Sequence, residues 1–245
     1  MINRIILYVL ALLLFACEGQ ELPDASLAVE AYIYTGKPVR DIKLSLVKPI
    51  NGIDEQIPVS DATVYIIWNS RYYPLEEDTI PGHFVYKFSN LTIESEESYT
   101  LYIKYHNKDY FAETTVPNPP VGFKANKDTL LLNSTNDLIN LSWQNSDSTW
   151  FLGVIAPGKE ISTDFPFNNF FSLPTRDSKL TITPEDIHIV GPQQFVLFGI
   201  TEDYEKLYRI SNSSIGSSNV GNVSNGFGIF AAFSSDTLSF VALEN

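Results

Sequence analysis

Cysteine and histidine have the most reactive side chains in this chain of 245 residues, which contains one cysteine and three histidines. His83, His106 and His188 are too scattered to form a local metal-ligand pair, and no His-Glu-x-x-His spacing puts two imidazoles on one helix face. We expect His83 and His106 to be solvent-exposed polar residues. Cys17 has no second cysteine with which to form a disulfide. These residues therefore predict no metal centre.

Other catalytic patterns are also missing from the sequence. There is no Gly-x-Ser-x-Gly elbow, and the glycines between Gly216 and Gly228 lack the Gly-Lys-Ser/Thr end of a phosphate-binding loop. The carboxylates of Glu76-Glu77-Asp78 and Glu94-Glu96-Glu97 could bind Ca²⁺, but no twelve-residue loop with alternating ligands surrounds them. We read both clusters as solvated loops and expect neither an enzyme nor a cofactor.

Cys17 ends an N-terminal segment with the pattern of an export signal. Arg4 precedes an uncharged apolar run at residues 5–15, shorter than the ~20 apolar residues of a transmembrane helix. The sequence Leu14-Phe15-Ala16-Cys17 resembles a bacterial lipobox, although Phe15 is larger than the residue usual at its place. We predict a lipoprotein signal peptide at residues 1–16 and lipidation of Cys17. The alternative is an ordinary signal peptide followed by a free cysteine.

The mature chain would be strongly acidic. Removal of residues 1–16 takes away one arginine and no acid, which leaves 15 basic and 29 acidic residues and a net charge of about −14. Such a charge argues against nucleic acid and anionic lipid as partners. Residues 17–25 form an acidic tether. Its Glu18, Glu21 and Asp24 resemble the export signal of Bacteroidota surface lipoproteins, which favours the cell surface over the periplasmic face.

The rest of the chain has the periodicity of strands. Between residues 26 and 116, apolar residues recur at every second position, as in Leu27, Val29, Ala31 and Ile33. Turn residues separate these runs, and Pro117-Asn118-Pro119-Pro120 interrupts them. We therefore predict an all-β protein with one β-sandwich at residues 26–117 and a second at residues 118–245.

The second predicted sandwich begins with the alternating row Ile139, Leu141 and Trp143, so Trp143 should be buried. Residues 201–212 have apolar positions at helical spacing, which predicts one short helix. Residues 212–225 are rich in Ser, Asn and Gly and should form an exposed loop. Two strands, at residues 226–233 and 237–243, should end the chain.

Aromatic residues make up 13% of the chain, and most of them should belong to the core. Tyr32, Tyr34, Tyr72, Tyr73 and Tyr102 lie opposite the apolar rows or in turns, so they belong either to a binding surface or to a second core. We take two loops as the candidate interface. Residues 165–171 offer aromatic anchors, and residues 212–225 offer adaptable hydrogen bonds. The candidate binding residues are Phe165, Phe167, Phe170, Phe171, Asn219 and Asn222.

Several short motifs resemble known modules. Pro58-Val59-Ser60-Asp61-Ala62-Thr63-Val64, Gly82-His83-Phe84 and Tyr99-Thr100-Leu101-Tyr102-Ile103 resemble a transthyretin-like or carboxypeptidase-regulatory-like sandwich. Val116-Pro117-Asn118-Pro119-Pro120 and Trp143 resemble an immunoglobulin-like module of fibronectin type III. With Asn222-Val223-Ser224-Asn225-Gly226-Phe227-Gly228-Ile229-Phe230 and the lipobox, their order resembles a Bacteroidota lipoprotein family, domain of unknown function 4249.

This resemblance implies a function. Members of that family are typically encoded beside TonB-dependent outer-membrane receptors and have no assigned catalytic residues. We therefore expect a non-catalytic binding or accessory module, held in the outer membrane by lipid on Cys17, with such a receptor as its partner. The alternative is a structural or adhesive surface lipoprotein, either pilus-associated or matrix-binding.

Overall fold

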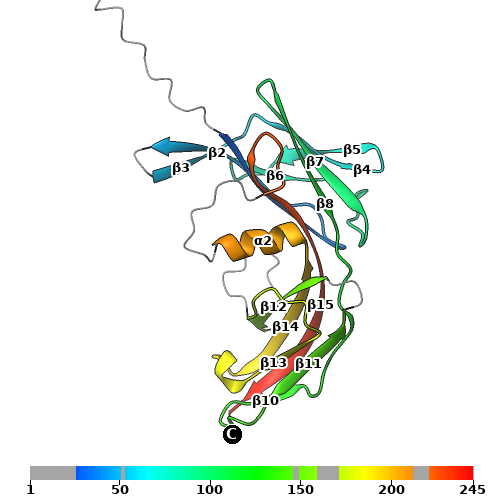
Figure 1. The fold of residues 1–245 in the computed structure, drawn as a ribbon, viewed down its shortest axis with the longest axis vertical. Helices are drawn as coiled ribbons and strands as arrows, with labels where there is room; N and C mark the ends of the chain where they lie inside the picture. Colours follow the sequence, from blue (N-terminus) through cyan, green and yellow to red (C-terminus); the bar gives the residue numbers. More distant parts are fainter. Residues whose placement is uncertain (1–25, 51–52, 146–148, 159–170, 212–220, 245) are drawn as a thin grey trace, which may run out of the picture.

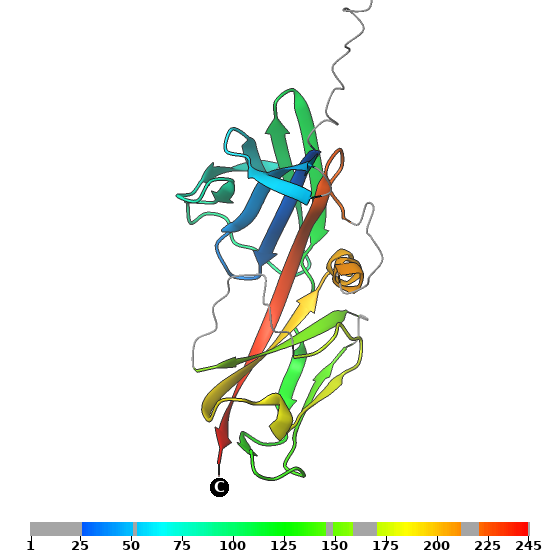
Figure 2. The ribbon, with the colours of Figure 1, turned by 90° about the vertical axis from the view of Figure 1, so that its left-hand side faces the viewer.

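The computed structural model describes residues 26–50, 53–145, 149–158, 171–211 and 221–244. They form two β-sheet lobes stacked along the long axis of the molecule, with the helix α2 (Glu202–Ser211) beside the junction (Figures 1 and 2). The predicted all-β class and the predicted helix are both confirmed. No helix in the described part of the chain is long and apolar enough to cross a membrane.

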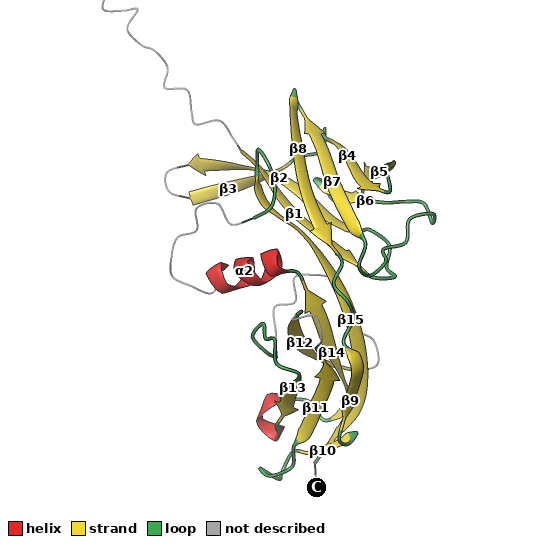
Figure 3. Cartoon of the chain, turned by 45° about the vertical axis from the view of Figure 1, so that its right-hand side comes forward, coloured by secondary structure: helices red, strands yellow, loops and turns green. Residues whose placement is uncertain are grey.

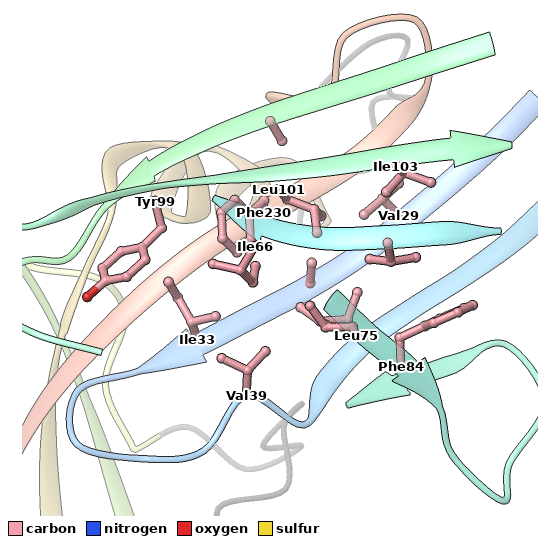
Figure 4. Packing of buried hydrophobic residues seen from close by; sticks show 14 of the residues in the cluster. Val29, Ile33, Val39, Ile66, Leu75, Phe84, Tyr99, Leu101, Ile103 and Phe230 are labelled. Carbon is pink, nitrogen blue, oxygen red and sulfur yellow. The ribbon is translucent and has the colours of Figure 1, made fainter. Parts of the chain in front are cut away.

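The first lobe is built from strands with one buried face. These are β1 (Ser26–Tyr34), β2 (Asp41–Ile50), β3 (Ile53–Pro58), β4 (Thr63–Trp68), β5 (Arg71–Glu77), β6 (His83–Val85), β7 (Ser98–Tyr105) and β8 (Lys108–Thr115). The predicted row from Leu27 to Ile33 is buried, as are alternate residues of β4, β7 and β8. Figure 4 shows these side chains meeting between the strands. The core that they form also contains Phe230 and Ala232 from the end of the chain.

The second lobe packs a small sheet against a larger one. Its elements are β9 (Val121–Ala125), β10 (Thr129–Leu131), β11 (Ile139–Gln144), β12 (Trp150–Pro157), β13 (Lys179–Ile182), the 3₁₀ turn η1 (Pro184–Asp186) and β14 (Gly191–Ile200). Strands β13, β11 and β9 form the small sheet. Trp143 of β11 is only 5% exposed and meets the rings of Phe123 and Phe151 at 6.2 and 5.5 Å. Its predicted burial is confirmed.

One long strand, β15 (Phe227–Leu243), belongs to both lobes (Figure 2). It pairs in parallel with β1 from Phe227 to Phe233 and antiparallel with β14 from Phe233 to Ala242. Two separate strands were expected here because residues 234–236 are polar. They instead continue the ladder with β14, because the ladder is made by backbone groups; Ser234 is buried in it, and Ser235 and Asp236 are exposed. The predicted boundary at residue 117 falls between β8 and β9, while β15 returns the chain to the first core.

A third core fills the junction between the lobes. Tyr32 of β1, Phe233 of β15 and Tyr204 of α2 meet there, with the Tyr204 and Phe233 rings 4.8 Å apart. Tyr34 stacks on Phe233 at 5.3 Å. For Tyr32 and Tyr34 the second-core alternative is therefore the right one. Burial raises the pKa of both hydroxyl groups well above the usual range, helped by the carboxylates of Glu30 and Asp41 at Tyr32 and by that of Asp41 at Tyr34.

Candidate functional site

Most of the binding residues predicted from the sequence lie outside the described residues. These are Phe165, Phe167, Phe170 and Asn219, and the same holds for Cys17. Phe171 is described and is half-buried, because its ring packs edge-on against Phe195 of β14 at 5.5 Å. Its backbone N–H donates to the carbonyl of Gly153. Phe171 therefore belongs to the edge of the second core.

Asn222 is held in a hydrogen-bond network that joins three elements. Its side-chain carbonyl accepts the N–H of Phe230 at 2.8 Å, and its amide donates to the Phe230 carbonyl at 2.8 Å and the Glu113 carbonyl at 2.9 Å. Asp203 of α2 lies 3.3 Å from the same amide nitrogen. Strand β14 ends opposite Phe233, so at Phe230 the side chain of Asn222 takes the place of a neighbouring strand.

The histidines and carboxylate clusters are placed separately from one another. Within the described residues, no group of three or more His, Cys, Asp or Glu side chains is close enough to hold a metal ion. His106 lies 3.5 Å from Asp61, and both side chains are exposed. Glu77 accepts the N–H of Gly82, and hydrogen bonds from Ser60 and Gly82 hold the pKa of Glu77 below its usual value. Glu77 therefore stabilises the turn between β5 and β6.

A groove of about 1700 Å³ lies in the first lobe, between residues 36–40, β5 and residues 85–92. It opens because β6 pairs with β5 only at Glu76 and Glu77. Beyond that point the N–H of Tyr86 donates to the Val39 carbonyl at 2.8 Å, and the N–H of Gly36 donates to the Ile93 carbonyl at 2.9 Å. The chain after β6 is thus bound to the loop after β1 and leaves the first half of β5 uncovered. Figure 3 shows these loops in green beside β5 and β6.

The floor of the groove is part of the first hydrophobic core. Tyr73, Tyr86 and Leu91 are buried, and the rings of Tyr73 and Tyr86 meet edge-to-face at 5.7 Å. Burial raises the pKa of the Tyr86 hydroxyl, which donates a hydrogen bond to the side chain of Asn90. A floor fixed by packing and by hydrogen bonds is preorganised, so a ligand would not have to order it.

The rim of the groove carries exposed cations. Lys87 forms an ion pair with Glu76 at 2.9 Å. Lys37, Arg40 and Arg71 are exposed and form no ion pair within the described part of the chain. Four cations and a single acid, Asp78, therefore line this groove, although the whole chain has a net charge of −13.

Two exposed aromatic rings stand on the same rim. Tyr72 is 61% exposed and Phe88 is 58% exposed, and no other Tyr, Phe or Trp among the described residues is more exposed than these two. Tyr72 contacts Tyr65 edge-on at 5.7 Å, and Phe88 lies 5.6 Å from Tyr86. Each ring is thus supported on one side and open on the other. The groove combines unpaired positive charge with open aromatic faces, which suits an anionic ligand that has flat apolar surfaces.

Sequence reasoning missed this groove because its residues come from three turns. Lys37 and Arg40 follow β1, Arg71 and Tyr72 begin β5, and Phe88 follows β6. No stretch of the sequence concentrates these charges. A usable signal was present at Arg71-Tyr72-Tyr73, where a cation and two aromatics follow the turn residues Asn69 and Ser70, both with positive φ.

Comparisons with known proteins give one family match. A family model described as "Domain of unknown function (DUF4249)" matches residues 15–239. No curated protein matches the sequence. Among solved structures, the FN1–FN3 domains of chicken CNTN1 align at 10% sequence identity with a TM-score of 0.19, covering 86% of this chain and 64% of that one. At that TM-score the alignment supports no argument about this protein.

Proposed function

The chain belongs to the DUF4249 family, a domain of unknown function, and we propose that it is a non-catalytic binding module of an outer-membrane TonB-dependent receptor system in Bacteroidota. Lipid on Cys17 would hold the module in the outer membrane, on the cell-surface side. The family match begins at residue 15 and so includes the lipobox-like Ala16-Cys17. Two acyl chains or more make such an attachment effectively permanent.

The observation that carries the binding role is the groove of the first lobe. Its rim is positively charged in an otherwise acidic protein, and its two open rings are each supported by a neighbouring tyrosine, Tyr65 under Tyr72 and Tyr86 under Phe88. A cleft lined by one sign of charge raises the local concentration of oppositely charged ligand and speeds its capture. Capture at a groove, followed by transfer to a receptor, fits a module that is anchored beside that receptor.

The test is co-purification from the native host. Tagged full-length protein is recovered from detergent-solubilised outer membranes after mild crosslinking, and its partners are identified by mass spectrometry. We expect a TonB-dependent receptor with the wild type. Cys17→Ala should appear as a soluble or uncleaved form and lose the receptor, because it has no lipid anchor. A wild type found in the soluble fraction would contradict the anchor, and ladders of its own copies without a receptor would support the structural or adhesive alternative.

A further inference from the structure

We propose that the groove of the first lobe binds an anionic saccharide chain, one that carries carboxylate or sulfate groups on its sugar rings. This inference rests on the proposed binding function and names the class of ligand. It depends on three features of the groove, which are the cations without partners, the open rings and the character of the uncovered strand.

The cations indicate a ligand with repeated negative charges. Arg40 and Arg71 lie on different walls of the groove, one in the loop after β1 and one at the start of β5. Neither guanidinium forms an ion pair within the described residues, so both forks remain available for a carboxylate or sulfate. Lys37 adds a third such charge. A chain with a charge on each unit could engage the cations of both walls at once.

The aromatic rings indicate sugars as the repeated unit. The C–H faces of a pyranose ring are flat and apolar, and they stack on exposed aromatic faces. Phe88 provides such a face beside the floor ring of Tyr86, and Tyr72 provides one at the edge of β5, on its solvent side next to Tyr65. Ser89, Asn90 and Thr92 also line the groove and carry hydrogen-bonding side chains. The groove is also larger than the 300–1,000 Å³ or so typical of sites for single small molecules, which favours an oligomer.

The uncovered half of β5 argues against a peptide as the ligand. An extended peptide binds a free strand edge through a ladder of backbone hydrogen bonds. Pro74 lies in this half of β5 and has no N–H to donate, so it interrupts such a ladder. Recognition must then come from side chains, and the side chains present are cationic and aromatic.

The experiment is a calorimetric titration of the full-length lipidated protein in detergent micelles. Oligogalacturonate tests the carboxylated saccharide and dextran sulfate tests the sulfated one. Methyl-esterified oligogalacturonate keeps the sugar rings and removes the charge, and poly-L-glutamate keeps the charge and removes the rings. We expect one of the two charged saccharides to bind at least about tenfold more tightly than methyl-esterified oligogalacturonate and than poly-L-glutamate. Its affinity should fall as the salt concentration rises.

Two pairs of substitutions locate the binding. Arg40→Gln with Arg71→Gln, and Tyr72→Ser with Phe88→Ser, should each weaken saccharide binding by about tenfold or more. Two matched controls change exposed residues away from the groove. Lys124→Gln with Lys179→Gln removes two cations from the second lobe, and Phe227→Ser removes an exposed ring of β15, so both should leave affinity unchanged within about twofold. Thermal unfolding of each variant confirms that it is folded, which the exposure of these side chains leads us to expect.

Each remaining result overturns a defined part of the proposal. Poly-L-glutamate could instead bind more tightly than the saccharides, with binding that is lost in the arginine variant and unchanged in the aromatic variant. That result would identify an acidic peptide as the ligand. Equal effects of the groove and control variants would show that any polyanion binds anywhere on the surface. Failure of all saccharides to bind, with the receptor still co-purifying, would refute the ligand class and leave the proposed function standing. Saccharide binding without co-purification of a receptor would refute the proposed receptor partner and leave the ligand class standing.

Discussion

Replacement of Asn222 tests whether its side chain acts as a substitute strand for β15. Both hydrogen-bonding groups of the Phe230 peptide backbone are bound by the Asn222 side chain at 2.8 Å, and Phe230 is 0% exposed. Asn222→Ala would leave this N–H and this carbonyl without partners in the protein, at a position that is only half-buried on the loop side. The Glu113 carbonyl of β8 would lose the Asn222 amide as a donor as well.

The expected loss can be estimated from these bonds. An orphaned buried donor or acceptor costs about 1–3 kcal/mol, and partial entry of water reduces that cost at the loop side. For the two groups of Phe230 we expect Asn222→Ala to lower the free energy of unfolding by about 3 kcal/mol. In a chain of this length that loss lowers the melting temperature by about 6–12 °C. Ser224→Ala, which removes one exposed side-chain bond to the Phe111 carbonyl, should cost less than about 1 kcal/mol and is the matched control.

Asn222→Asp separates the hydrogen bonds from side-chain volume. The carboxylate still accepts the N–H of Phe230, but its second oxygen would face the carbonyls of Phe230 and Glu113 and the carboxylate of Asp203. This repulsion raises the pKa of the introduced carboxyl in the folded state above its unfolded value. The penalty is therefore full at neutral pH and disappears as pH falls from the folded pKa towards about 4.

Urea unfolding, followed by intrinsic fluorescence at pH 7 and pH 5, measures all three variants. Asn222→Asp should be less stable than Asn222→Ala at pH 7, and the gap should narrow at pH 5. If Asn222→Ala unfolds within about 0.5 kcal/mol of wild type, Asn222 has no structural role, and the sequence-based reading of it as a binding residue becomes the better one.

Three further changes test the cores and one ion pair. Trp143→Ala should lower the free energy of unfolding by about 3–5 kcal/mol, and Trp143→Phe by clearly less, because the buried indole N–H has no hydrogen-bond partner among the described residues. Gly228→Ala should prevent the pairing of β1 with β15, since a Cβ at its φ of +98° would lie 1.9 Å from the Val29 carbonyl oxygen, whereas Gly36→Ala has open space and should cost about 1 kcal/mol in a thermal melt. Hydrogen bonds from Lys127 and the Leu131 backbone lower the pKa of Asp137. The ionised carboxylate therefore stabilises the fold fully above about pH 4, and this contribution is lost as pH falls through the lowered pKa. Unfolding curves of Asp137→Asn, measured against pH, should lack that part of the acid dependence.

Local patterns in the sequence were sufficient for much of the fold. Alternation identified the buried face of β1, helical spacing identified α2, and the row that ends at Trp143 identified a core position. The continuity of β15 could not be read in this way, because Ser234, Ser235 and Asp236 resemble a turn until β14 is known to pair with them. The pattern of a strand is local, whereas its partners are set by the whole chain.

The groove was out of reach for the same reason. Its three walls are adjacent only because the sheet order places β2, β6 and β5 side by side, with β1 beyond β2. The sequence separation between Arg40 and Arg71 hides their common surface. Asn222 shows the converse, because its polar loop suggested an interface and the fold uses its side chain to complete a sheet.

The position of the groove relative to the proposed anchor bears on how a ligand would reach it. The lipidation proposed at Cys17 lies nine residues before Ser26, where β1 begins, and the groove starts at Gly36, just after β1 ends at Tyr34. A nine-residue strand spans about 30 Å. The groove and the tether are thus at opposite ends of the same strand. A saccharide would then bind at the end of β1 opposite to the one that the proposed tether joins.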